Sequence, residues 1–318
     1  MNTDHTIRLF AGTSHPVLAQ EVSDYLHIPL GQCSISRFAD GEIGVAIEES
    51  VRGCDCYVIQ SPSRTVNDSL MEMLIMVDAL QRSSAGTITM VLPYYAYARQ
   101  DRQARPRTPI TAKLVADLIT TSGATRVMAM DLHAGQIQGF FSVPFDHLYA
   151  TPVLLEAMRG VAGDRLDEAI VVSPDAGGVE RARQYAKRLG TELAIIDKRR
   201  PAANVAEVMN VIGDVRGKTA FLVDDMIDTA GTLCSAAEAL VRNGAKSVYA
   251  FATHGLFNGP AVERVDASSL SKVFVTNTVP VKPNQVGCSR IEVLSVGAVL
   301  GEAIRRVHGY SSVSSLWT

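Results

Sequence analysis

The stretch that decides the fold runs Phe221-Leu-Val-Asp224-Asp225-Met-Ile-Asp228-Thr229-Ala-Gly231-Thr232. An apolar strand from Thr219 to Val223 ends in two adjacent carboxylates, and a turn of small residues leads into a helix that continues to Val241. This order is typical of a parallel sheet with helices on both faces. Because ligands of open α/β sheets bind beyond the carboxyl ends of the strands, the turn is expected to bind a ligand.

The turn offers different chemistry at its two ends. Ala230 and Gly231 let the backbone approach a ligand closely, and the first N–H groups of the helix suit an anion. The two carboxylates would repel a phosphate, so sugar hydroxyls or a magnesium ion are their expected partners. A pentose 5-phosphate carries both features. A plain helix cap at Asp228 or Thr229 would explain only one of the three acidic residues. The expected binding residues are Asp224, Asp225, Asp228, Thr229, Ala230, Gly231 and Thr232.

Short apolar runs alternate with helical patterns along the whole chain of 318 residues. The segments 12–60 and 173–224 join matching strand ends across nearly equal intervals, which predicts two copies of one α/β domain, each a mainly parallel sheet flanked by helices. The expected domains are residues 1–148 and 149–304. A tail at 305–318 is expected to pack on the first domain.

One helix of the first half has a clear apolar period. Its expected core face is Leu70, Met73, Leu74, Val77 and Leu80. Ser69 followed by Glu72 predicts a capping box at its start.

Composition narrows the class of protein. A net charge of −3 provides no basic field for non-specific nucleic-acid binding. No signal peptide or membrane span is expected, and five cysteines without a framework spacing indicate a cytoplasmic protein. Cys54-Asp-Cys56 could be a metal-binding fragment, although two buried side chains on one face of a strand are the plainer interpretation.

The first half carries two further loops that suit a nucleotide. In Arg37-Phe-Ala-Asp40-Gly-Glu42, Phe38 can stack on a purine, while the two carboxylates can accept from its exocyclic amine. The segment Tyr94-Tyr-Ala-Tyr-Ala-Arg99-Gln100-Asp101-Arg102 follows a strand that ends at Leu92. Arg99 could bind phosphates through its guanidinium fork.

These segments together resemble one enzyme family. The Asp224 loop resembles the 5-phosphoribosyl-1-diphosphate loop of the type I phosphoribosyltransferase fold, and the chain from about Leu9 to Leu316 resembles the ribose-phosphate pyrophosphokinases. The resemblance implies transfer of the β,γ-diphosphate of ATP to the anomeric hydroxyl of ribose 5-phosphate. It assigns ATP binding to Phe38, Asp40, Glu42, Arg99, Gln100 and Asp101.

The resemblance also assigns the metal and the catalytic residues. His133 matches the ligand of the Mg²⁺ that accompanies ATP, and Asp175 matches the ligand of a second Mg²⁺, the expected cofactor. One histidine and one carboxylate, completed by water, suit Mg²⁺ better than zinc. Lys198 and Arg200 match the catalytic residues of a flap, which here is a stretch without clear period to about Val211. Phosphoryl-type transfer needs chiefly positioning and charge stabilisation.

Regulation and assembly rest on the resemblance alone. The phosphate-activated class of the family implies phosphate and ADP as opposed effectors, bound between the subunits of a homohexamer. The matching residues are Ser50, Arg52, Arg82, Ser83, Ser84, Ser311, Ser312, Val313 and Ser314.

Two other functions fit the same fold. A salvage phosphoribosyltransferase would need only one such domain, so the duplicated half with its ATP loops argues against it. A non-catalytic regulatory relative is the other alternative, and the presence of His133, Asp175, Lys198 and Arg200 argues against that.

Overall fold

The computed structural model describes residues 6–199, 208–285 and 287–317, and these form two compact units. The first unit comprises residues 1–149, 278–280 and 295–318, and the second comprises residues 150–277 and 281–294. Both are α/β units with a mainly parallel sheet between helices, so the predicted fold class is confirmed.

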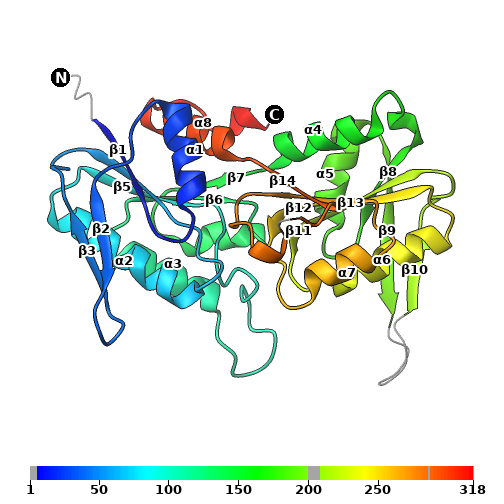
Figure 1. Ribbon diagram of the computed structural model, residues 1–318, viewed down its shortest axis with the longest axis horizontal. Helices are drawn as coiled ribbons and strands as arrows, with labels where there is room; N and C mark the ends of the chain where they lie inside the picture. Colours follow the sequence, from blue (N-terminus) through cyan, green and yellow to red (C-terminus); the bar gives the residue numbers. More distant parts are fainter. Residues whose placement is uncertain (1–5, 200–207, 286, 318) are drawn as a thin grey trace. The chain divides into compact units, whose positions relative to one another are not determined.

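The first unit is built on a fully parallel five-stranded sheet with the order β1-β4-β5-β6-β7. Helices α2 and α3 cover one face, and α1 and α8 cover the other (Figure 1). Its strands are β1 (Ile7–Ala11), β4 (Asp55–Ile59), β5 (Thr87–Leu92), β6 (Arg126–Met130) and β7 (Phe145–Leu148), with a separate antiparallel pair of β2 (Cys33–Arg37) and β3 (Ile43–Ile47). Its helices are α1 (Pro16–Leu26), α2 (Val66–Arg82), α3 (Thr111–Thr121) and α8 (Gly297–His308), with short 3₁₀ turns η1 (Gly135–Phe140) and η4 (Ser314–Leu316).

The second unit has a seven-stranded sheet with the order β10-β9-β8-β11-β12-β13-β14. Only the edge strand β10 is antiparallel to its neighbour. Its strands are β8 (Ala169–Ser173), β9 (Glu192–Arg199), β10 (Val208–Ile212), β11 (Thr219–Ile227), β12 (Ser247–Gly255), β13 (Lys272–Thr276) and β14 (Ile291–Leu294). Its helices are α4 (Thr151–Ala162), α5 (Val179–Leu189), α6 (Gly231–Arg242) and α7 (Ala261–Ala267), with 3₁₀ turns η2 (Leu166–Glu168) and η3 (Pro283–Gln285).

The two units share one strand order. From β1 the first sheet continues through β4, β5, β6 and β7, and from β8 the second continues through β11, β12, β13 and β14. The central strands β4 and β8 are buried along their whole length, because helices cover both faces of the sheet. The second sheet adds the hairpin of β9 and β10 at its edge.

The chain returns to the first unit earlier than the expected tail at 305. Residues 295–318 belong to the first unit, including all of α8. Gly297 and Gly301 lie one turn apart on α8, and a Cβ at either position would overlap Glu21 or Tyr25 of α1. Tyr25 Oη also donates to Glu302 Oε2 at 3.0 Å. The small residues let the two helices approach closely, so α8 packs on α1.

The capping box predicted at Ser69 is wrong. Helix α2 begins at Val66 with Thr65 as its N-cap, so Ser69 lies inside the first turn. Glu72 is buried and accepts hydrogen bonds from the backbone N–H and hydroxyl of Thr13, both at 2.7 Å, and from Gln60 Nε2 at 2.8 Å. The position of Glu72 is thus determined by Thr13 and Gln60, which lie outside the four-residue pattern from Ser69 to Glu72.

The stretch predicted to lack a clear period contains strand at both of its ends. Strand β9 continues to Arg199, and β10 pairs with it so that Met209 lies opposite Lys198. Met209 and Val211 pack against the core of the second unit, the alternation expected of a half-buried strand. Residues 200–207, and with them Arg200, lie outside the described residues.

Candidate functional site

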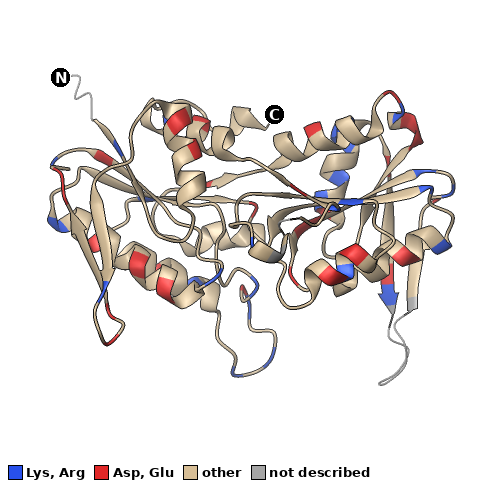
Figure 2. Ribbon diagram, in the orientation of Figure 1, with Lys and Arg blue, Asp and Glu red and all other residues tan. Residues whose placement is uncertain are grey.

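The ends of three neighbouring strands meet in one pocket of the second unit. Strands β9, β8 and β11 are adjacent and parallel, so their carboxyl ends lie at the same edge of the sheet. Lys198 comes from the end of β9, Asp175 follows β8 and Asp224 comes from β11. All three line a pocket of about 230 Å³ together with the loop Asp228–Thr232. The structure thus brings these sequence-predicted residues together, and Figure 2 shows basic residues at the tip of β9.

At its acidic end the pocket is lined by Asp224, and one arginine contacts both Asp224 and the buried Asp225 beside it. Strand β11 continues to Ile227 instead of ending before Asp224, because Asp224 still pairs with Ala252 of β12. Arg181 Nη1 lies 3.3 Å from Asp224 Oδ1 and 3.4 Å from Asp225 Oδ1. Asp225 is 4% exposed, whereas the Asp224 side chain is 30% exposed. Asp224 is therefore the carboxylate of the pair that can meet a ligand.

The electrostatics of this pair favour a ligand that stabilises the charged carboxylate. Burial and the adjacent Asp225 raise the pKa of Asp224 above the ordinary range of an aspartate, and the nearby Arg181 offsets this only in part. Hydroxyl donors or a divalent cation at Asp224 would favour its ionised form. The carboxylate is thus poised to gain from binding a sugar diol or a metal ion.

The other end of the pocket is the start of α6. Ala230 has a positive φ of 58°, a conformation that costs a residue with a side chain about 1 kcal/mol. Helix α6 begins at the next residue, Gly231, so its first N–H groups have no acceptor within the helix. Gly231, Thr232 and Leu233 all line the pocket. The arrangement suits a phosphate, because N–H groups and the helix dipole both favour an anion.

Side chains outside the Asp228–Thr232 loop stabilise it through hydrogen bonds. Asn258 Nδ2 donates to Asp228 Oδ1 at 2.7 Å, and Lys282 Nζ donates in turn to Asn258 Oδ1 at 2.7 Å. Arg264 of α7 donates to the carbonyl of Thr229 at 2.9 Å. The sequence analysis missed these residues and Arg181. The only sequence signal for Arg181 is a basic residue six positions after Asp175, which does not distinguish it from its neighbours.

The predicted ATP-binding residues lie in two loops of the first unit, and the predicted metal ligand His133 lies in a third. Phe38 is 62% exposed at the turn between β2 and β3, as a stacking residue must be. Arg37 Nη2 beside it lies 2.9 Å from Asp68 at the start of α2. Tyr97 Oη donates to the adjacent Asn67, which brings the loop after β5 to the same helix. The start of α2 therefore ties the Phe38 turn to the loop that carries exposed Arg99 and Gln100.

The third loop follows β6 and carries His133. Its imidazole is exposed, and Gln136 Nε2 in the same loop donates to Asp101 Oδ2 at 2.7 Å. The loop after β5 and the loop after β6 are thus joined. Asp40 caps the Phe38 turn by accepting from the backbone N–H of Glu42 at 3.1 Å. The structure gathers the predicted nucleotide residues along one end of the first sheet.

The predicted metal ligands suit a cation that keeps most of its water. Asp175 is half-buried, and its Oδ1 accepts from the Gly178 N–H at 2.9 Å, which leaves Oδ2 for another partner. Within residues 6–199, 208–285 and 287–317, no group of three or more His, Cys, Asp or Glu side chains could hold a metal. A cation at His133 or Asp175 would thus depend on water and phosphate oxygens, as Mg²⁺ commonly does.

The two cysteines on β4 and just before it are buried core residues. Cys54 and Cys56 both belong to the apolar cluster of the first unit. Burial raises the pKa of the Cys56 thiol to about 12, so this thiol stays protonated and is a poor metal ligand. The plainer interpretation of Cys54-Asp-Cys56 agrees with the structure.

The predicted regulatory residues form two groups. The Gly53 N–H donates to the Ser84 carbonyl at 2.9 Å and Arg52 bridges to Ala85, so the Arg52 segment lies beside Ser83 and Ser84. Arg82 is exposed and pairs with Asp78 at 2.7 Å. In the tail, Arg306 donates to the Ser312 carbonyl at 2.9 Å, and the hydroxyls of Ser312 and Ser314 lie 2.8 Å apart.

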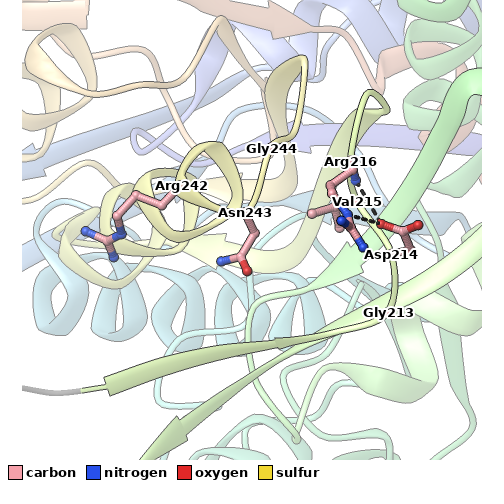
Figure 3. Close-up of a pocket in the computed structure, with 7 residues that line it drawn as sticks. All are labelled: Gly213, Asp214, Val215, Arg216, Arg242, Asn243 and Gly244. Atoms are coloured by element: carbon pink, nitrogen blue, oxygen red, sulfur yellow. Dashed lines mark hydrogen bonds and ion pairs between the residues drawn. The ribbon is translucent and has the colours of Figure 1, made fainter.

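A larger pocket of about 540 Å³ lies elsewhere in the second unit. Figure 3 shows Arg216 bound to Asp214 at its wall, through its backbone N–H and its side chain at 3.2 and 3.3 Å. This pocket lies between the start of β11 and the end of α6. Ligands of such sheets bind beyond the carboxyl ends of the strands, whereas this pocket lies at the amino end of β11. The smaller pocket is therefore the better candidate for the ligand-binding site.

Two α/β units with the same strand order, one with a pocket between Asp224 and the start of α6, define a protein of the type I phosphoribosyltransferase fold class. A model for the N-terminal domain of ribose phosphate pyrophosphokinase matches residues 7–123, and one for the phosphoribosyl synthetase-associated domain matches residues 200–318. The chain belongs to the ribose-phosphate pyrophosphokinase family and is an enzyme.

Individual relatives match over almost the whole chain. The ribose-phosphate pyrophosphokinase of Bacillus subtilis is 56% identical, with 99% of this chain and 98% of the relative covered. That of Synechococcus elongatus is 58% identical, with 99% and 94% covered. The crystal structure of phosphoribosylpyrophosphate synthetase from Mycobacterium smegmatis aligns with a TM-score of 0.91 at 44% identity and covers 96% of this chain and 100% of that chain. Across the described residues, no helix has both the length and the apolar character that a membrane crossing requires.

Proposed function

We propose that the enzyme transfers the β,γ-diphosphate of ATP to the anomeric hydroxyl of ribose 5-phosphate, giving 5-phosphoribosyl 1-diphosphate and AMP for nucleotide biosynthesis. The observation that carries the proposal is the pocket that joins Asp224 to the start of α6. Family membership supports the same reaction.

Ribose 5-phosphate binds along this pocket with its phosphate at the helix start. The N–H groups of Gly231 and Thr232 and the hydroxyl of Thr229 bind the phosphate, while Asp224 accepts from the ribose hydroxyls. Asp225 is too buried to meet the sugar directly, and it contacts Arg181 instead. The anomeric carbon then lies on the side of the pocket that Lys198 lines.

ATP binds to the loops of the first unit. Phe38 stacks on the adenine, Asp40 and Glu42 accept from its amine, and Arg99 binds the phosphates with Gln100 and Asp101 nearby. Magnesium is the proposed cofactor: His133 would hold the ion that accompanies ATP, and Asp175 would hold a second ion. Bound magnesium would neutralise charge at the phosphates. The exposed His133 and the free oxygen of Asp175 fit this role.

In the reaction, the anomeric hydroxyl releases its proton to solvent and its oxygen forms a bond to the β-phosphorus. The bond from the β-phosphorus to the oxygen of the α-phosphate breaks, and AMP leaves with that oxygen. Lys198 and Arg200 stabilise the charge of the transferring diphosphate. Lys198 lines the sugar-phosphate pocket, which supports its part in this proposal. Arg200 is assigned by family resemblance.

Regulation and assembly are proposed from the same family. Phosphate activates and ADP inhibits through Ser50, Arg52, Arg82, Ser83, Ser84 and the tail segment Ser311–Ser314. Hydroxyls and guanidinium groups suit both anions. The enzyme is a cytoplasmic homohexamer in this proposal, and it binds neither nucleic acid nor membranes.

The direct test is the appearance of AMP when ATP, Mg²⁺ and ribose 5-phosphate are mixed with the enzyme. The proposal requires AMP to form only when ribose 5-phosphate is present, with one 5-phosphoribosyl 1-diphosphate for each AMP. A salvage transferase would instead consume 5-phosphoribosyl 1-diphosphate in the presence of a base. A non-catalytic relative would bind both substrates and form neither product. Either result contradicts the proposal.

A further inference from the structure

Three aromatic rings connect the end of the chain to the end of the first sheet. The ring of Trp317 packs edge-on against Tyr149, with centroids 5.6 Å apart and planes at 74°. Tyr149 in turn lies over His147 of β7, with centroids 4.4 Å apart and planes at 35°. All three side chains are half-buried and belong to the first unit. Trp317 thus reaches β7 through a single intervening ring.

His147 makes a hydrogen bond to the turn after β6. The Leu132 N–H donates to His147 Nε2 at 3.0 Å, and the Tyr149 hydroxyl lies 3.2 Å from His147 Nδ1. A nitrogen that accepts a hydrogen bond carries no proton, so the neutral imidazole carries its proton on Nδ1. Nδ1–H then donates to the Tyr149 oxygen. Tyr149 therefore favours the tautomer in which His147 can accept from Leu132.

The turn that His147 holds has an unusual backbone and carries His133. Asp131 has a positive φ of 39°, which residues with a side chain rarely adopt and which costs of order 1–3 kcal/mol. Such a conformation persists only where the surroundings fix it. The Asp131 N–H donates to the Leu148 carbonyl at 2.9 Å, and Leu132 is buried. The bond to His147 is a further fixed point, one residue before exposed His133.

The tail that presents Trp317 is attached to α8. Arg306 lies 2.7 Å from Glu302 Oε1, donates to the Ser312 carbonyl at 2.9 Å and contacts the Ser315 hydroxyl. His308 Nδ1 lies 3.0 Å from Asp55 Oδ2, which fixes the end of the helix to the sheet. These bonds hold the last residues before Trp317, so the ring has a defined place against Tyr149.

We propose that Trp317, Tyr149 and His147 are positioning residues for the His133 turn, so that the end of the chain contributes to the binding of the metal–nucleotide complex without touching it. The proposal rests on the proposed function, which gives His133 that ligand. None of these three residues was among the functional residues predicted from the sequence. Because the coupling free energy between two sites is reciprocal, a ligand at the His133 turn should in turn favour the packed position of Trp317.

The test measures binding without turnover. Calorimetry of the full-length enzyme with Mn²⁺ and α,β-methylene-ATP, whose α–β bridge cannot be cleaved, gives the Kd of the complex. Trp317→Ala should raise this Kd about 5- to 20-fold, within the coupling range of such networks. Trp317→Phe keeps a ring against Tyr149 and should restore the Kd to within about 2-fold. Tyr310→Ala is the matched control, because this aromatic residue of the tail is 93% exposed and should leave the Kd unchanged.

Two further measurements keep all three rings in place, so they do not depend on a variant that loses packing. Tyr149→Phe keeps the stacked ring and removes only the hydroxyl, and it too should raise the Kd. Trp317 is the only tryptophan of the chain, so wild-type fluorescence reports on its surroundings. The emission should change during the titration and saturate with the calorimetric Kd.

Wild-type affinity in both Trp317→Ala and Tyr149→Phe would overturn the positioning proposal, and so would an unchanged emission. The variant His133→Ala distinguishes failure of the positioning proposal from failure of the proposed function. If His133→Ala weakens binding while the aromatic variants do not, only the positioning proposal fails. If His133→Ala binds like the wild type, the assignment of the metal–nucleotide complex to His133 fails instead.

Discussion

The two units differ at the carboxyl ends of two equivalent strands: buried side chains fill the end of β4, the closed end, whereas a pocket lies at the end of β11, the open end. Strand β4 holds the place in the first sheet that β11 holds in the second. After β4, Gln60 and Ser61 are fully buried, and Glu72 of α2 makes three hydrogen bonds to Gln60 and Thr13. After β11, Asp224 and the start of α6 line a pocket. Polar side chains that bond one another stabilise the fold, whereas those left facing a pocket can bind a ligand.

In the first unit, side chains packed around Gln60 fill the space at the end of β4. A Cβ at Gly12 would overlap the Gln60 side chain, and the Gln60 Oε1 accepts from the Ser14 N–H at 3.2 Å. Gln60 Nε2 also donates to the Ser69 carbonyl at 3.2 Å. The buried amide is thus fully used within the protein. If the comparison is right, substitutions at the open end should change activity, and substitutions at the closed end should change stability.

The largest effect is expected at the open end. Lys198→Ala should lower kcat about 10²- to 10³-fold with a smaller change in KM for ATP, because the charge acts mainly in the transition state. The free energy of unfolding should change by less than about 0.5 kcal/mol, since the residue lies at the end of an edge hairpin. Lys187→Ala on the exposed face of α5 is the control. Steady-state kinetics with an unchanged kcat and a raised KM would remove Lys198 from the catalytic residues.

The closed end should respond in the opposite way. Glu72→Ala removes one of the two acceptors of the buried Gln60 amide nitrogen and the acceptor of the Thr13 N–H, which should cost about 1–3 kcal/mol of unfolding free energy. Asp68→Ala, at an exposed position of the same helix, should cost much less. Urea unfolding measures both. The KM for ribose 5-phosphate should stay the same in each variant, and a selective loss of sugar affinity in Glu72→Ala would contradict the comparison.

A smaller effect concerns the dependence of stability on pH. A carboxyl group whose pKa is raised by folding contributes stability below its ordinary pKa and loses that contribution as the pH rises through the folded value. Asp224 is such a group. Above the ordinary aspartate range, Asp224→Asn should therefore be more stable than the wild type, by up to about 1 kcal/mol after screening by solvent. Thermal unfolding without ligands at pH 5 and pH 8 tests this, and a wild type that gains stability over the variant at pH 8 would contradict the raised pKa.

The sequence predicted those parts of the fold that have long apolar runs. Strands such as Thr87–Leu92 are buried on both faces, so their composition alone identifies them. The hairpin of β2 and β3 and the edge strand β10 were missed, because half-exposed strands mix polar and apolar residues. Strand β11 continues through two aspartates since β12 offers it hydrogen-bond partners, and a sequence does not state which neighbour a strand will have.

The residues of the candidate site could be predicted where they lie at or just after the carboxyl end of a strand. Asp175, Lys198 and Asp224 lie far apart in the sequence and share a pocket because β8, β9 and β11 are neighbours. Arg181 and Glu72 show the limit of such reasoning. Each acts through partners more than ten residues away, and no local pattern separates them from other charged residues on their helices.

The sugar phosphate is proposed to bind in the second unit and ATP in the first, and one binding experiment tests this placement most directly. Ribose 5-phosphate and α,β-methylene-ATP are each titrated by calorimetry into the wild type and into the double variant Asp224→Asn, Asp225→Asn. The double variant is expected to bind ribose 5-phosphate at least about 10-fold more weakly, because Asp224, the charged acceptor of the sugar hydroxyls, is lost, while the ATP analogue binds as in the wild type. Loss of the analogue with intact sugar binding would contradict it.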